Sequence, residues 1–213
     1  MQHAAVLCSK TAPYVRLAFT AATMSHPHWQ YFLSVEEDLL QCARFVEFDQ
    51  QNFQTYSVQF ARVIVAAAAE FDAVAKALCN LIEPTSRPQS INAYHPIVVG
   101  TYPKFIDYTI HVPRAKLQFQ PWQTWTAKAS PNWWSKGYNK IKHERDQHFS
   151  AANLGNALQA VAGLLVGIAY LYDRMYGSVP RLDLELAPKL FEPQDHPGSM
   201  QTSNLGWSCK VWK

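Results

Sequence analysis

The longest uncharged apolar run in the chain covers residues 157–172 and is interrupted by a single strongly polar side chain, Gln159. A helix that crosses a bilayer needs about 20 predominantly apolar residues, so this run is too short to be a membrane span. Its small residues Ala160, Gly163 and Gly167 are three and four apart and would share one helix face. We expect a buried core helix and no membrane association.

Two further stretches have the 3.6-residue period of amphipathic helices, residues 28–48 and residues 57–82. The second contains neither Gly nor Pro, and residues 66–69 at its centre are all alanine. This lack of bulk would let it pack closely against the small residues of the apolar run. With the polar segment before that run, these stretches predict a mainly α protein, a bundle of four main helices.

The period changes between residues 97 and 120. Three short β-branched or alternating runs, residues 97–102, 108–112 and 116–120, are bounded by Pro103, Pro113 and Pro121. We expect a small antiparallel sheet or hairpin inserted into the helical domain at about residues 97–120.

The length of 213 residues and the 48% hydrophobic content suit one domain, at residues 25–177. Residues 1–24 contain no acid and are expected to form a poorly structured extension. Residues 178–213 are proline-rich, which predicts an extended C-terminal arm. Leu186, Leu190 and Phe191 are its expected anchors.

Charge and cysteine content exclude several classes of function. The net charge of +3, without a run of five Lys or Arg, does not indicate nucleic-acid binding by charge alone. The four cysteines are far apart, as is typical of reduced thiols in a cytoplasmic protein. No glycine-rich phosphate loop, nucleophile elbow or zinc-ligand spacing is present. We therefore expect no cofactor and no metal.

Four tryptophans, Trp122, Trp125, Trp133 and Trp134, lie close together in the sequence. Such clusters can stack on nucleic-acid bases, but packing the hairpin onto the helices is the favoured interpretation. An exposed edge of this region would supply apolar surface for a dimer.

A dense polar segment follows the tryptophans. On a helix, Asn139, Lys142, His143 and Asp146 would share one face, and Tyr138, Lys142 and Arg145 the adjoining stripe. Because a core helix follows directly, we expect this cluster to lie partly out of water. An imidazole beside cations and an amide could transfer protons and hold a phosphate. The alternative is a solvated helix whose charges pair with one another.

Glu70 leaves an alanine-rich face of residues 57–82, beside an expected i, i+4 pair of Asp72 and Lys76. A desolvated carboxylate there needs a tertiary partner. We expect this partner to be Lys142, His143 or Arg145, in a pair that could serve either the fold or catalysis.

Two long helices, a break, and the sequence YNKIKH at residues 138–143 before a final core helix resemble the HEPN superfamily. The resemblance implies a helical domain that acts as a metal-independent RNase, commonly as a dimer, in toxin–antitoxin, phage-defence or CRISPR systems. The HEPN motif is Arg, four to six residues, then His, often with Asn after the Arg. Asn139 and His143 match it, but Tyr138 stands where the Arg would be. Glu70 resembles a carboxylate of some members.

Together with the cysteine content, the resemblance implies a HEPN-like cytoplasmic homodimer that is RNA-associated in phage defence or the stress response. If it is an enzyme, it would be a metal-independent endoribonuclease. His143 would then be the acid or base, Asn139 would orient the phosphate, and Lys142 or Arg145 would stabilise its charge. The alternative is a non-catalytic dimerisation or scaffold module, or a nucleotide-binding module.

Overall fold

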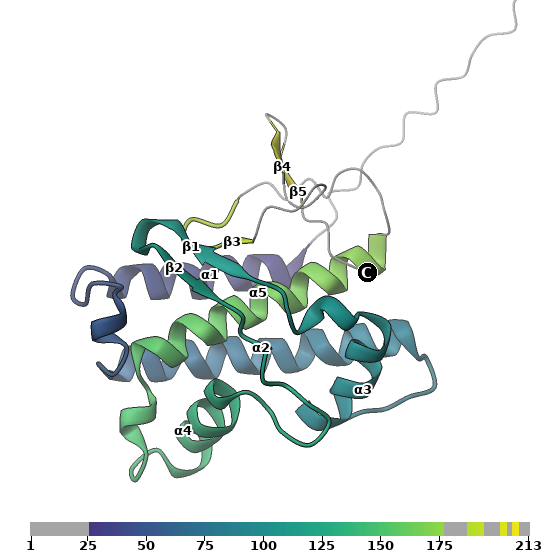
Figure 1. Cartoon of the computed structure of the whole chain (residues 1–213), viewed down its shortest axis with the longest axis horizontal. Helices are drawn as coiled ribbons and strands as arrows, with labels where there is room; N and C mark the ends of the chain where they lie inside the picture. Colours follow the sequence, from purple (N-terminus) through teal and green to yellow (C-terminus); the bar gives the residue numbers. More distant parts are fainter. Residues whose placement is uncertain (1–25, 177–186, 194–200, 204–205, 209–213) are drawn as a thin grey trace, which may run out of the picture.

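The computed structural model describes residues 26–176, 187–193, 201–203 and 206–208. The expected extension at residues 1–24 lies outside them. The described part of the chain is mainly helical (Figure 1). Its five α-helices are α1 (Pro27–Cys42), α2 (Val58–Ile82), α3 (Ile91–Thr101), α4 (Asn139–Glu144) and α5 (Leu154–Tyr176).

Helices α2 and α5 lie along each other at the centre of the bundle, as the small residues predicted. The close approach is made at Gly167, where a Cβ atom would lie 2.8 Å from the Phe71 ring of α2. Gly163 differs from the prediction, because it faces Trp133 and Trp122. Helix α5 has the length and composition of a membrane span, but 89% of its most apolar 18-residue window is buried. It is placed as the core helix of a soluble protein would be.

Side-chain caps mark the starts of three helices. Ser57 accepts a hydrogen bond from the Phe60 N–H at 3.1 Å and caps α2. Ser90 caps α3 in the same way, and Asn153 accepts from the Asn156 N–H at 3.0 Å at the start of α5. Each cap satisfies an N–H that has no partner inside its helix.

The strand expected at residues 97–102 is wrong, because this stretch is the end of α3. Its β-branched residues suggested a strand. The Ser90 cap starts a helix instead, and Tyr94, Ile97 and Val98 bury one face of it. Tertiary burial therefore outweighs local β propensity here.

The expected hairpin is confirmed. Strands β1 (Ile110–Val112) and β2 (Leu117–Phe119) are antiparallel, with Ile110 opposite Phe119. Strand β3 (Glu192–Pro193), from the C-terminal arm, pairs with the other edge of β1 to give the order β2-β1-β3. Strands β4 (Gln201–Ser203) and β5 (Gly206–Ser208) form a separate antiparallel pair.

The C-terminal arm is anchored where the sequence indicated. Leu190 and Phe191 are buried, at 2% and 1% exposure. The third expected anchor, Leu186, lies outside the described residues. The arm therefore contributes both a strand and two core side chains.

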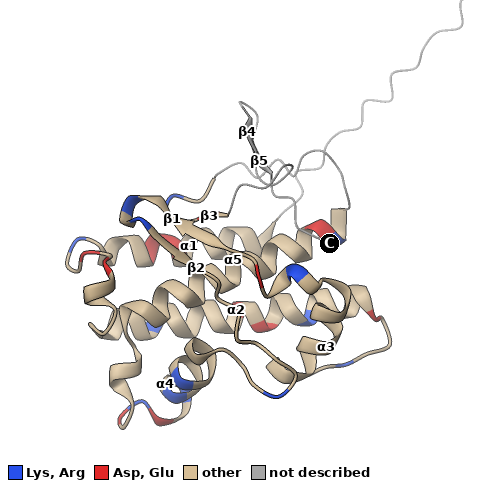
Figure 2. Ribbon diagram, viewed as in Figure 1, with Lys and Arg blue, Asp and Glu red and all other residues tan. Residues whose placement is uncertain are grey.

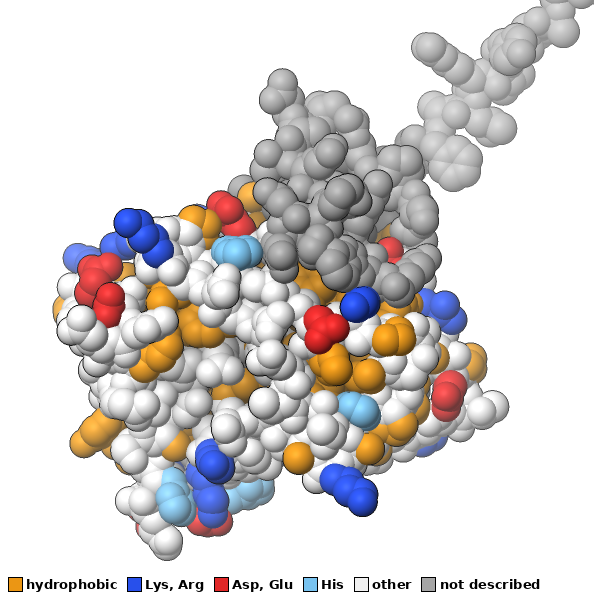
Figure 3. Space-filling view, viewed as in Figure 1, with side chains coloured by type: hydrophobic (Ala, Val, Ile, Leu, Met, Phe, Trp, Pro, Cys, Tyr) orange, Lys and Arg blue, Asp and Glu red, His pale blue; other side chains and the backbone are white. Residues whose placement is uncertain are grey.

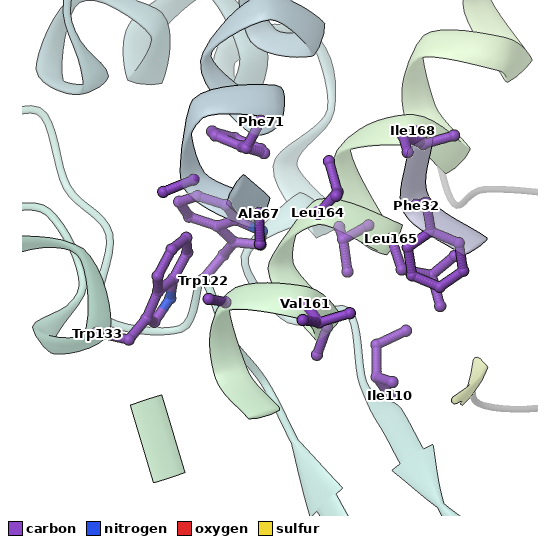
Figure 4. Packing of buried hydrophobic residues seen from close by; sticks show 14 of the residues in the cluster. Phe32, Ala67, Phe71, Ile110, Trp122, Trp133, Val161, Leu164, Leu165 and Ile168 are labelled. Carbon is purple, nitrogen blue, oxygen red and sulfur yellow. The ribbon is translucent and has the colours of Figure 1, made fainter. Parts of the chain in front are cut away.

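The four clustered tryptophans are buried. Figure 4 shows two of them, Trp122 and Trp133, among the other core side chains. Trp122 donates its indole N–H to the Gly163 carbonyl at 3.1 Å, and Trp133 donates to the Pro121 carbonyl at 2.8 Å. Packing is therefore their role, as favoured above. The expected apolar edge for a dimer is not supplied by these residues, since none of the four is more than 5% exposed.

Candidate functional site

Helix α4 carries the predicted site and lies at the edge of the bundle (Figure 2). A π-helix, η4 (Trp133–Tyr138), leads into it without a break. The chain then turns after Glu144 and passes through a 3₁₀ turn, η5 (Phe149–Ala151), before α5 begins at Leu154. The position of the polar segment in the sequence suggested that it forms the first turn of the core helix. In the structure it is a separate helix, and a turn divides it from α5.

This turn places most of the polar cluster in water. Lys142, His143, Arg145 and Asp146 are exposed, Asn139 is half-buried, and Tyr138 is buried. The expectation that the cluster lies partly out of water is wrong for its charged members, because α4 contributes Ile141 to the core and turns its other face outward. Lys, Arg and His side chains gather over α4 in Figure 3.

The charges of this segment fall into two groups. Glu144 accepts a hydrogen bond from Lys140 at 2.8 Å and lies 3.0 Å from Nε2 of His148. The bond from Lys140 is the main reason that the pKa of Glu144 is lowered. In the described part of the chain, no carboxylate lies within ion-pair distance of Lys142, His143 or Arg145. The structure thus brings three unneutralised basic side chains together in one exposed turn.

Tyr138, at the position where a HEPN motif would have Arg, is part of the core. Its ring packs against Trp134 at a centroid distance of 4.9 Å and is 7% exposed. The Lys142 Nζ lies 5.4 Å from the centroid of the Tyr138 ring, a cation–π contact. The lysine therefore lies over a buried ring that supplies no positive charge.

The expected pair of Asp72 and Lys76 is confirmed, at 2.5 Å. Asp72 also accepts a hydrogen bond from the hydroxyl of Tyr94 on α3 at 2.7 Å. Burial, and then this bond, raise the pKa of Tyr94. These contacts connect α2 to α3, so the pair serves helix packing.

Glu70 has the tertiary partner that its surroundings required, but a different one. Its carboxylate lies 2.5 Å from Nδ1 of His28 on α1. The expected pairing with Lys142, His143 or Arg145 is wrong, because those side chains extend into solvent from α4. Glu70 consequently does not belong to the α4 site.

Sequence reasoning missed the most buried carboxylate of the described chain, Glu36 on α1, which is 1% exposed. It accepts hydrogen bonds from three successive backbone N–H groups, those of Lys189, Leu190 and Phe191. Burial raises the pKa of Glu36, and these bonds oppose that shift. Its position on the apolar stripe that contains Phe32 and Leu39 was the available signal, since an acid there needs a partner.

No group of three or more His, Cys, Asp or Glu side chains suited to holding a metal ion occurs within the described ranges. Comparisons of the chain with protein-family models, with curated proteins and with solved structures found no match. The arrangement at α4 must therefore be interpreted from its own chemistry: an exposed set of cations and an imidazole on a rigid aromatic base.

Proposed function

We propose that the protein is a cytoplasmic RNA-associated protein that contacts RNA phosphates through Lys142, His143 and Arg145, and that it does not cleave the RNA on its own. The proposal rests on a difference between paired and unpaired charged side chains within one segment. Glu144 pairs with Lys140 and His148, while Lys142, His143 and Arg145 are exposed and have no carboxylate partner among the described residues.

A polyanion is the ligand that such a surface suits. Residues 136–148 contain four Lys or Arg and two acids, so this short segment carries a net charge of +2 out of +3 for the whole chain. Cations that contact phosphates release counterions and supply binding that does not depend on base sequence. Asn139 and the imidazole of His143 add hydrogen-bonding groups one turn apart.

Binding without cleavage follows from the position of Tyr138. HEPN-like cleavage, which the resemblance implies, would need a fixed cation beside His143 to stabilise charge on the phosphate in the transition state. Tyr138 supplies a buried, uncharged phenol at that position, and the exposed Lys142 and Arg145 lack a surrounding shell that would fix them. A homodimer that adds a residue in trans stays a prediction.

The test is the binding of a fluorescent single-stranded RNA to the full chain, followed by anisotropy at several salt concentrations. We expect a dissociation constant of roughly 1–100 μM at physiological salt, in the range of non-specific binding. Lys142→Ala and Arg145→Ala should each weaken binding and reduce the salt slope by about one. Lys128→Ala and Arg62→Ala, which remove exposed cations elsewhere, are the matched controls.

Two results would overturn the proposal. If Lys142→Ala and Arg145→Ala bind RNA as the controls do, the segment is only a solvated helix. If the unmodified chain cleaves RNA in the presence of a chelator and His143→Ala does not, the protein is a nuclease and the statement that it does not cleave is wrong.

A further inference from the structure

The contact between His28 and Glu70 is the most enclosed pairing of a basic and an acidic side chain in the described chain. Its two side chains are 25% and 16% exposed, while both partners in each of the other such pairs are at least 31% exposed. It lies on α1 and α2, and neither residue takes part in the α4 site. When one ring nitrogen of a histidine is hydrogen-bonded to a carboxylate, the other ring nitrogen can still form a hydrogen bond with a ligand.

That nitrogen is Nε2. An ionised carboxylate can only accept hydrogen bonds, so Nδ1 of His28 carries the proton that Glu70 binds at 2.5 Å. In the neutral ring, Nε2 is then an acceptor in a fixed orientation. No described residue donates a hydrogen bond to it.

His28 lines a cavity of about 470 Å³, where the start of α1 meets the ends of α2 and α5. Figure 1 shows these three helix ends on the same side of the bundle. The other described lining residues are apolar or aromatic, among them Leu81, Tyr172, Met175 and Tyr176, with the exception of the exposed Asn80. Sites for small molecules have volumes of roughly 300–1,000 Å³, so one small ring compound would fit.

The lining determines the class of ligand. The ring centroids of Tyr172 and Tyr176 lie 5.8 Å apart, and the angle between the two ring planes is 63°. The His26 ring contacts both of them. No Lys or Arg lines the cavity in the described chain, and the nearest described carboxylate to His28 is Glu70, which contacts its Nδ1. Carboxylates and phosphates are therefore disfavoured as ligands. No Ser, Thr or Cys lines it either, so the described lining offers no hydroxyl or thiol nucleophile.

We propose that this cavity binds a small, uncharged aromatic molecule that carries a hydroxyl group, a phenol. Its ring packs against Tyr172 and Tyr176, and its hydroxyl donates a hydrogen bond to Nε2 of His28. The site is independent of RNA binding, because it uses other helices and other side chains.

The test compares phenol with toluene, which has nearly the same shape but no hydroxyl. Binding to the full chain is measured by ligand-observed NMR and by shifts of the His28 ring resonances. One hydrogen bond corresponds to about 1 kcal/mol, so phenol should bind about five- to tenfold more tightly than toluene. Equal affinities for the two probes, or no binding of either, would overturn the proposal.

Two variants, Ala77→Phe and His28→Phe, locate the binding site, and a third, Ala73→Phe, is the control. Ala77→Phe fills the cavity and should abolish binding of both probes, while Ala73→Phe, one turn earlier on α2 at an exposed position, should leave binding unchanged. His28→Phe should lower the affinity for phenol to that for toluene. Circular dichroism verifies that each variant is folded. Unchanged phenol binding in folded Ala77→Phe or His28→Phe would show that the site is elsewhere.

Discussion

Glu36 on α1 accepts a hydrogen bond from the backbone N–H of Leu190 at 2.9 Å, although 154 positions separate the two residues in the sequence. The same carboxylate also accepts from the N–H groups of Lys189 and Phe191, at 2.9 and 3.2 Å. A single buried side chain thereby satisfies three successive donors of the C-terminal arm. This contact joins the arm to the helical domain, together with the β1–β3 pairing and the burial of Leu190 and Phe191.

Glu36→Ala should release the arm. The three N–H groups lose their acceptor, and an unsatisfied buried group costs about 1–3 kcal/mol. We expect the free energy of unfolding to fall by about that amount, because the arm can detach and hydrate the remaining donors. Urea titration measures the loss, and faster amide exchange at Lys189, Leu190 and Phe191 locates it.

The matched control for this change is Glu37→Ala. Glu37 pairs with Nζ of Lys189 at 2.7 Å, but both side chains are well exposed. Such a pair contributes at most about 1 kcal/mol. Equal losses in the two variants would mean that the backbone contacts of Glu36 do not hold the arm.

Gly167→Ala should destabilise the protein by about 1–3 kcal/mol, as overpacking of a core does. The added Cβ would meet the Phe71 ring at 2.8 Å, where α5 packs against α2. Gly100→Ala on α3 is the control, since nothing lies within 4 Å of its Cβ position. It should raise stability by about 0.5–1 kcal/mol. Thermal midpoints of the two variants that shift in the same direction would contradict this packing argument.

His143→Ala should change the thermal midpoint very little. His143 is exposed and has no ion-pair partner in the described chain, and surface substitutions usually alter stability by less than about 0.5 kcal/mol. If the midpoint fell strongly, His143 would have to belong to a polar network that holds the fold together. Calorimetry of the variant therefore tests whether His143 has a structural role.

Tyr138→Arg would introduce the Arg that the HEPN motif has at this position, but it should destabilise the fold by roughly 2 kcal/mol, because a guanidinium would replace a ring packed on Trp134. Tyr138→Phe should retain nearly all stability. Chemical unfolding compares the two variants. Chelator-resistant RNA cleavage by folded Tyr138→Arg would show that the fold can support HEPN chemistry and lacks only the cation.

Alkaline pH should lower stability partly through Cys79. Burial raises the pKa of its thiol from 9.0 to about 12. The unfolded chain therefore loses this proton first, so stability falls as pH rises from about 9 to about 12. Cys79→Ala should reduce the fall without abolishing it, because burial also raises the pKa of Tyr172 to about 12. An unchanged pH profile in urea titrations would contradict the assignment.

The features that sequence predicted correctly are those with a local cause. The period of residues 57–82 predicted α2 to within one residue at its start, and the alternation around Pro113 predicted the hairpin. Helix α3 was missed because Ile97, Val98 and Val99 favour strands locally. Burial against the core decides their conformation, and no local pattern reports it.

The sequence identified residues of the candidate site but not their exposure to solvent. Helical spacing correctly placed Asn139, Lys142 and His143 on one helix. The turn between Glu144 and Leu154, which puts them in water, has no strong breaker such as Pro or Gly before Gly155. The partners of Glu36 and Glu70 lie on other elements, so spacing along the chain could show that each acid needs a partner but not which one.

The burial of the tryptophans has an optical consequence. The five tryptophans of residues 26–176 are each at most 5% exposed. Four of them form a continuous series of ring contacts, and two of these, Trp122 and Trp133, lie against Gly163 of α5. In a chain with Trp207 and Trp212 replaced by Phe, tryptophan emission would come only from these five buried side chains. It would report the integrity of the bundle centre and remain unchanged when RNA contacts the tips of Lys142 and Arg145. Fluorescence can therefore separate unfolding from surface binding within a single titration.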